Sequence, residues 1–304
     1  MHGMGAIRGF LEVDCPDKWL RFHGTQEWYD LWGNERSRNE LFQFFDHYLK
    51  GIDNRWQDVP KVRVAALRFG EEDPIENIVV KDFPIPNTRY EQAYLKSDGK
   101  LDLERAPESR ATLEYDSCGP KGSMATFTYT FEKQSKIIGI PKAVLYMSCP
   151  DHDDLDVFVI LKKMSASGEP MTALNVPWKG IPVGTIAEIP PDKATEVITY
   201  NGPTGVLRAS QRSIDKDKSM HENWPYYPQD REEKVPPGET VRLEIGIWAT
   251  GIQFEAGEGI QLQVAGHFLG IANFGAPVGS SKGKHVVHCG GNEASHVVLP
   301  FVDI

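Results

Sequence analysis

Hydrophobic positions repeat with a helical period only near the start of this chain of 304 residues. Five apolar side chains there fall at i, i+3, i+4, i+7 and i+8 and would line one face of a helix. Ser37 and Glu40 match the S-x-x-E capping box that begins helices, and Gly51 stands where a glycine often ends one. A short apolar stretch at residues 18–22, followed by His23, predicts a strand before this helix. The apolar stripe consists of Leu41, Phe44, Phe45, Tyr48 and Leu49.

From residue 62 onward the apolar period changes to two, which is typical of half-buried strands. Short strands separated by Gly, Pro and Asp predict a mainly β protein, namely a β-sandwich of the jelly-roll type. The lack of a visible repeat of about 40 residues argues against a propeller. The proline-containing stretch 174–193 predicts a long surface loop. The predicted strands are residues 62–69, 90–96, 125–131, 142–148, 156–161, 205–212, 241–247, 260–264, 285–289 and 297–302.

Composition places the chain among soluble globular proteins, with 40% hydrophobic and 25% charged residues. The length leaves room for roughly two domains. A net charge of -10 argues against nucleic acid or an anionic membrane as a partner, because both attract a basic face. No apolar stretch is long enough for a signal peptide or a membrane span, so we predict a cytoplasmic protein. The four cysteines form no C-x-x-C pair and are predicted to be reduced and buried as small apolar side chains, with two disulfides as the less favoured alternative.

One segment matches the G-x-S-x-G elbow of serine hydrolases letter for letter, at residues 279–283. That elbow requires a strand before the serine and a helix after it, so that the strained turn exposes the hydroxyl. Here a predicted strand at residues 285–289 follows in place of the helix. We therefore interpret the match as chance and predict no serine nucleophile in this chain.

No metal or cofactor site is predicted. His285 and His288 are three residues apart on a predicted strand, so they point to opposite faces. His288 and His296 could face each other across a turn, with His267 nearby, but structural roles are favoured for all of them. Residues 151–156 are rich in Asp, yet an EF-hand would need Gly and Glu where Asp and Lys stand. A calcium site of another kind stays open there, and no nucleotide-binding glycine motif is present.

His23 is the candidate catalytic residue. It follows a predicted strand and precedes an aromatic loop that contains Trp28 and Trp32. The catalytic base of an α/β-hydrolase stands at such a place. Position alone favours an ordinary, partly buried histidine, and only a wider resemblance reverses that preference.

Several segments together resemble the CocE/NonD-type serine hydrolases, the group that includes cocaine esterase and X-prolyl dipeptidyl-peptidases. Residues 18–28, with the sequence KWLRFHGTQEW, resemble the strand and catalytic histidine of that family. Residues 44–54, FFDHYLKGIDN, are similar to the last helix of its α/β-hydrolase domain. Further similar segments, extending into the family's C-terminal jelly roll, are residues 60–64, 154–159, 256–267 and 283–288.

The resemblance implies a Ser–His–Asp triad in which the serine attacks an acyl carbonyl and the histidine moves the proton. His23 matches the histidine of that triad. In family members the nucleophile, the oxyanion-hole groups and the acid precede anything that corresponds to residue 1. Asp14 and Asp17 stand in the wrong place for the acid. We therefore expect this chain to be truncated relative to the family and inactive alone.

The sequence thus predicts an α/β-hydrolase C-terminal remnant at residues 1–59 and a galactose-binding-like jelly roll at residues 60–304. The resemblance implies the C-terminal part of a serine hydrolase that acts on small-molecule acyl, ester or X-prolyl dipeptidyl substrates. A non-catalytic module that binds carbohydrate or a partner protein is the alternative. A third possibility is that another chain supplies the missing catalytic half. Exposed apolar side chains on the remnant also predict self-association.

Overall fold

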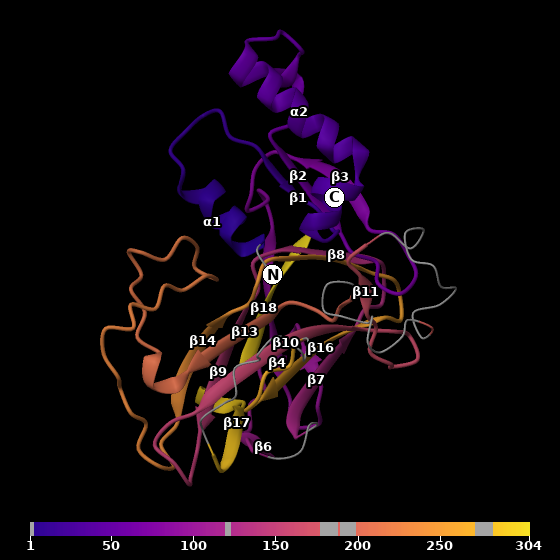
Figure 1. Ribbon diagram of the computed structural model, residues 1–304. Coiled ribbons are helices and arrows are strands. Elements are labelled where there is room, and N and C mark those ends of the chain that lie inside the picture. Colours follow the sequence, from indigo (N-terminus) through magenta and orange to yellow (C-terminus); the bar gives the residue numbers. More distant parts are fainter. Residues whose placement is uncertain (1–2, 119–122, 177–187, 189–198, 271–281) are drawn as a thin grey trace. The chain divides into compact units, whose positions relative to one another are not determined.

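The computed structural model divides the chain into two compact units, and each is described by itself (Figure 1). Unit 1 comprises Met1–Pro86 and Ala173–Tyr200, and unit 2 comprises Asn87–Thr172 and Asn201–Ile304. A domain boundary after residue 59 stays a prediction. The residues that the structure describes are 3–118, 123–176, 188, 199–270 and 282–304.

Unit 1 is built on a three-stranded sheet in the order β1-β2-β3. Strand β1 (Leu20–Phe22) runs parallel to β2 (Val62–Ala66), and β2 pairs antiparallel with β3 (Ile75–Val80). The strand predicted at residues 18–22 is therefore present, though shorter. The other described elements are α1 (Gly3–Glu12), the π-helix η1 (Tyr29–Gly33), α2 (Glu35–Lys50), the 3₁₀ helix η2 (Trp56–Asp58), β11 (Ala173–Leu174) and β12 (Thr199–Tyr200).

The helix predicted from the apolar stripe is α2, but its start differs from the prediction. Asn34, not Ser37, is the N-cap, and its side-chain oxygen accepts a hydrogen bond from the Ser37 amide at 3.4 Å. Ser37 lies inside the helix and is buried. At the other end, Gly51 adopts a φ of 67°, the left-handed conformation that favours glycine and ends the helix as predicted.

Apolar side chains of α2 remain largely uncovered in the structure. Its inner side contacts an aromatic cluster in which Trp56 is buried and lies 5.2 Å from Phe44, ring centre to ring centre. Leu49 is 76% exposed and Phe42 55% exposed on the other side. The exposure expected for this helix is thus present. Helix α1, which the sequence did not predict, buries only Ile7.

Unit 2 consists mainly of two sheets (Figure 1). Its described strands are β4 (Arg89–Leu95), β5 (Leu101–Asp102), β6 (Ala111–Asp116), β7 (Met124–Thr130), β8 (Ser135–Gly139), β9 (Lys142–Ser148), β10 (Asp156–Met164), β13 (Thr204–Arg208), β14 (Val241–Gly246), β15 (Thr250–Phe254), β16 (Gly259–Ala265), β17 (Lys284–Cys289) and β18 (His296–Val302). One sheet has the order β13-β10-β16-β7. The other has the order β15-β8-β18-β9-β17-β6, with β14 on β9 and β4 on β18. The mainly β fold is confirmed, and the jelly-roll topology stays a prediction.

The core of unit 2 comes from the facing sides of these strands. Val159 and Leu161 on β10 and Leu145 on β9 are fully buried, and each contributes about 1.5–3 kcal/mol relative to an exposed side chain. Lys163 on β10 donates a hydrogen bond to the Gln253 carbonyl on β15 at 2.8 Å, which links the two sheets. Unit 2 is therefore a packed β structure with its own core.

Some predicted boundaries are corrected by the structure. The strand predicted at residues 205–212 ends at Arg208 and continues as the 3₁₀ helix η5 (Ala209–Gln211). Ala173 and Leu174 form β11, although a loop was predicted from residue 174, and most of that loop falls outside the described residues.

Two further predictions concern the state of the cysteines and the presence of a membrane span. The four cysteines are thiols in the structure; Cys149 and Cys289 are buried, as predicted, whereas Cys118 is exposed and Cys15 half-buried. Burial raises the pKa of the Cys289 thiol to about 11, so this side chain stays protonated and packs as a small apolar group. Among the helices in the described ranges, none is both long enough and apolar enough to cross a membrane.

Candidate active site

His23 stands at the carboxyl end of β1, next to the parallel strand β2. Ligand and catalytic groups in parallel sheets gather at this end, because the chain leaves the sheet there in loops. The imidazole is 22% exposed, so one side of the ring still reaches solvent. Burial lowers the pKa of His23, while the Asp30 carboxylate acts in the opposite direction. The ring is thus held neutral at a pH near 7 and is able to accept a proton.

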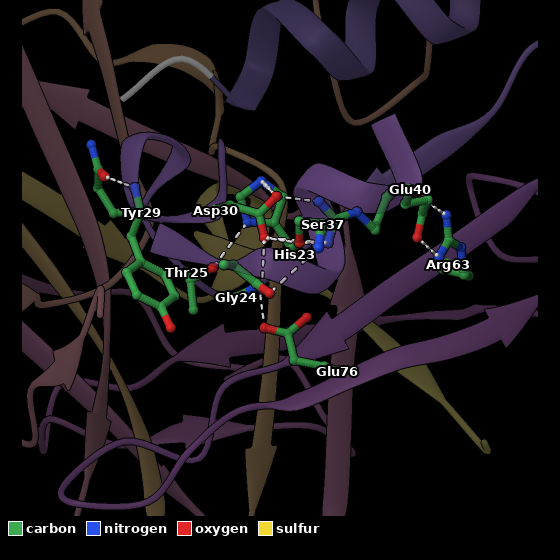
Figure 2. Close-up of polar contacts among 12 residues, drawn as sticks. His23, Gly24, Thr25, Tyr29, Asp30, Ser37, Glu40, Arg63 and Glu76 are labelled. Carbon is green, nitrogen blue, oxygen red and sulfur yellow. Dashed lines mark hydrogen bonds and ion pairs between the residues drawn. The ribbon is translucent and has the colours of Figure 1, made fainter. Parts of the chain in front are cut away.

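Two polar side chains lie beside the His23 ring, and Figure 2 shows both. Its Nδ1 lies 3.3 Å from the Thr25 hydroxyl, and its Nε2 lies 4.0 Å from Asp30 Oδ2. In a serine-hydrolase triad the acid faces Nδ1 and the nucleophile faces Nε2. Asp30 lies near the opposite nitrogen, so it does not occupy the position of the triad acid. Among the described residues, the hydroxyl beside the ring belongs to Thr25 and not to a serine.

Asp30 is the buried centre of a polar network that builds this site. It belongs to η1 and is 4% exposed. Arg21 on β1 forms a bidentate ion pair with its carboxylate, and the Ser37 hydroxyl donates a hydrogen bond to Oδ1 at 2.8 Å. Asn34 adds a longer contact of 3.4 Å. The network joins β1, η1 and the first turn of α2, so these elements fix the surroundings of the His23 ring.

Glu76 approaches the same site from β3. Its Oε1 accepts a hydrogen bond from the backbone N–H of Gly24 at 3.0 Å (Figure 2). Burial raises the pKa of Glu76, and the neighbouring Asp30 adds to that rise, whereas the Gly24 hydrogen bond and Arg21 oppose it. The turn directly after His23 is thereby attached to the third strand of the sheet.

A second ion pair attaches α2 to the sheet. The guanidinium of Arg63 on β2 binds the Glu40 carboxylate through both terminal nitrogens, one of them at 2.8 Å (Figure 2). Arg63 is buried, and its Nε has no hydrogen-bond partner in the structure. Glu40, predicted from the sequence to be part of a capping box, thus pairs with a strand residue instead.

The histidines considered for a metal site lie apart in unit 2. His285 is fully buried, and its Nδ1 lies 3.0 Å from the Tyr115 hydroxyl; burial lowers its pKa to about 4. His288 and His296 pair with different residues of β9, so they do not face each other. Within the residues that the structure describes, no group of three or more His, Cys, Asp or Glu is arranged to hold a metal ion.

Two other sequence motifs remain, the acidic segment and the G-x-S-x-G match, and only the first lies fully within the described residues. In the acidic segment 151–156, Asp154 accepts hydrogen bonds from the amides of Leu155 and Ser210, and Asp156 pairs with Arg208. These carboxylates therefore hold the strand ends. The serine of the G-x-S-x-G match, Ser281, lies outside the described residues.

The sequence pointed to His23 as a candidate and did not point to its neighbours Asp30 and Glu76. Asp30 is seven residues from His23 in a segment with no helical or strand period, and Glu76 is on a strand that was not predicted. Neither position carries a motif. Their proximity to His23 follows only from the pairing of β1, β2 and β3.

Comparisons with known proteins agree with this architecture. The family described as the X-Pro dipeptidyl-peptidase C-terminal non-catalytic domain matches residues 54–298. A crystal structure of a CocE/NonD family hydrolase from Staphylococcus aureus is 28% identical over 99% of this chain, with a TM-score of 0.84. This match covers 52% of that hydrolase, so the chain spans about half its length.

More distant structures share the fold alone. An aminopeptidase from a marine sediment archaeon, Thaumarchaeota archaeon, is 15% identical over 90% of this chain and 45% of its own, with a TM-score of 0.60. An α-amino acid ester hydrolase is 15% identical over 88% of this chain and 46% of its own, with a TM-score of 0.55. No curated protein sequence matches the chain. The chain belongs to the X-Pro dipeptidyl-peptidase C-terminal domain family and is similar to the C-terminal portion of CocE/NonD hydrolases.

Proposed function

We propose that this chain is the C-terminal part of a serine hydrolase that acts on acyl, ester or X-prolyl dipeptidyl substrates, with His23 as its catalytic base. The observation that carries the proposal is the place of His23. It is a partly exposed imidazole at the carboxyl end of a strand in a parallel pair, and burial lowers its pKa. An imidazole in that state accepts the proton of an attacking hydroxyl and returns it to the leaving group.

We further propose that the chain is inactive alone. The ring of His23 has the Thr25 hydroxyl as its neighbour, and no serine in the described part of the chain hydrogen-bonds to it. A general base without a nucleophile has nothing to activate. The description of the matched family as non-catalytic is in keeping with this proposal.

Exposed apolar side chains on unit 1 support a protein partner that completes the enzyme. Trp28 is 61% exposed and Trp32 70% exposed on the segment after His23. Large exposed apolar side chains gathered on one part of a soluble protein mark interaction sites. We propose that the catalytic half of the hydrolase covers this surface. The surface also includes Leu31, Leu41, Phe42, Phe45, Tyr48, Leu49 and Ile52.

A fusion protein tests this function. The part of the Staphylococcus aureus hydrolase that this chain does not match is joined to this chain, and turnover of p-nitrophenyl acetate is measured for both. We expect turnover by the fusion and none by the chain alone. In the fusion, His23→Ala should lower kcat by about 10³-fold or more, because the base of a triad is removed.

His152→Ala is the matched control, since His152 is an exposed histidine of unit 2 and belongs to neither the candidate site nor the apolar surface. It should leave kcat within about twofold of the parent, as expected of a surface substitution. A soluble fusion without turnover, or one in which His23→Ala retains it, would contradict the proposed role of His23.

A further inference from the structure

The strand that holds Glu76 belongs to the segment matched by the non-catalytic family, whereas His23 precedes that segment. The match begins at residue 54, so it includes β2 and β3 but not β1. Yet β1 pairs with β2, and Glu76 on β3 contacts Gly24, the residue after His23. The non-catalytic family segment therefore reaches the candidate catalytic residue directly.

We propose that Glu76 is a positioning residue for His23, so that the non-catalytic segment determines where the catalytic imidazole lies. This inference rests on the proposed function of His23. Glu76 itself touches no reacting atom. It acts through the backbone of the turn that follows the histidine.

Two contacts hold this turn against β3 and the residue that precedes it. The Gly24 N–H donates to the Glu76 carboxylate at 3.0 Å, and a charged acceptor makes such a bond stronger than a neutral one. The backbone of Gly24 also lies so close to Pro74 that a Cβ there would be 2.8 Å from the Pro74 Cβ. Strand β3 pairs with β2 on both sides of Glu76, at Ile75 and at residues 78–80, with an irregularity of the ladder between them, so the sheet supports the strand that holds Glu76.

A substitution can distinguish the role of the Glu76 side-chain oxygen from the role of its negative charge. Burial opposes its ionised form, and Asp30 opposes it further. A glutamine would keep an oxygen that accepts from Gly24 while removing a charge that the surroundings disfavour. If the oxygen positions the turn, Glu76→Gln should keep the hydrogen bond from the Gly24 N–H that Glu76→Ala loses.

Nuclear magnetic resonance of the chain itself tests the contact. We expect Glu76→Ala to raise hydrogen exchange at the Gly24 amide by about tenfold, because a native hydrogen bond is lost. The titration midpoint of the His23 imidazole should rise toward the ordinary value as the ring becomes more solvated. Glu76→Gln should change exchange at Gly24 by less than about threefold.

Glu71→Ala is the matched control, because Glu71 is exposed in the turn just before β3. It should alter neither signal. The inference is overturned if Glu76→Ala leaves both signals unchanged, or if Glu76→Gln is as disruptive as Glu76→Ala. Faster exchange throughout β1, β2 and β3 in Glu76→Ala would also overturn it, since that would show a general structural role.

The fusion separates this inference from the function on which it rests. There we expect Glu76→Ala to lower kcat about tenfold with KM nearly unchanged, and Glu76→Gln to restore kcat. If His23→Ala abolishes turnover but Glu76→Ala leaves kcat unchanged, the positioning role alone is overturned. If His23→Ala retains turnover, the function of His23 fails, and the positioning of a catalytic group fails with it.

Discussion

At the scale of single residues, Gly24 is a position where the surroundings leave little room for a side chain. A Cβ at Gly24 would lie 2.8 Å from the Pro74 Cβ and 3.1 Å from Glu76 Oε1. We predict that Gly24→Ala destabilises the chain by about 1–3 kcal/mol, because the turn must move away from β3. Urea unfolding followed by circular dichroism measures the change.

Gly9→Ala provides the comparison for this substitution. A Cβ at Gly9 meets nothing within 4 Å, and Gly9 lies inside helix α1. Alanine is favoured over glycine within a helix by about 0.5–1 kcal/mol, so this variant should be as stable as the parent or more stable. Equal stability of Gly24→Ala and Gly9→Ala would show that the turn has free space.

At this scale the sequence can point to a residue that belongs to a motif but not to residues that only spatial proximity brings together. His23 was proposed from its place after a strand and from a family resemblance, and its catalytic role stays a prediction. Ser37 and Glu40 were expected to cap α2, but Asn34 takes that role. Ser37 and Glu40 instead bind Asp30 and Arg63, contacts that depend on how distant segments pack.

At the scale of elements, the outer face of α2 leaves large apolar side chains exposed. Phe42 and Leu49 are 55% and 76% exposed, so they contribute little to the core of unit 1. We predict that the double variant Phe42→Ser and Leu49→Ser changes the free energy of unfolding by less than about 1 kcal/mol. It should also lower self-association of the chain, because the apolar surface that drives association is reduced.

Sedimentation velocity at increasing protein concentration measures this effect. The parent chain should show a rising sedimentation coefficient, and the double variant should show a smaller rise. Phe44→Ser is the matched comparison, because Phe44 packs against Trp19 and Trp56 and its loss should destabilise unit 1. A parent chain that stays monomeric throughout would contradict the prediction.

Elements in which apolar residues recur at a regular spacing could be predicted, and elements without such a spacing could not. Strand β7 alternates between Phe127, Tyr129 and their threonine neighbours, and its position was predicted correctly. Strand β8 places Ile137 and Ile138 side by side, both fully buried, so it shows no alternation. Strand β3 has five partly covered residues out of six, and it too lacks a clear period.

At the scale of the whole molecule, the mainly β fold could be predicted from the sequence, but the pairing of strands that are far apart in the chain could not. Strand β1 is far from β2 in the sequence, and their parallel pairing places Leu20 opposite Val62. Such pairing depends on long-range contacts that no local period encodes. The same pairing brings the His23 turn to Glu76, which explains why the candidate site was only partly predictable.

Unit 2 contains one arrangement that could be mistaken for a second active site. Ser148 Oγ lies 2.8 Å from His288 Nε2, and His288 Nδ1 lies 3.2 Å from Glu293 Oε2. A serine, a base and an orienting acid in this order resemble an activated nucleophile. However, Ser148 is only 5% exposed, and the Thr240 hydroxyl lies 3.3 Å from the same nitrogen of His288.

We therefore predict that a fluorophosphonate probe does not label Ser148 in the isolated chain. Attack on phosphorus requires room beside the hydroxyl and donors for the developing negative charge, and a nearly buried serine within a sheet leaves little such room. Mass spectrometry of digested protein identifies the labelled residue. The fusion with the catalytic half is the positive control and should be labelled in the added part. Labelling of Ser148 that His288→Ala abolishes would contradict the prediction and show that unit 2 carries a reactive serine of its own.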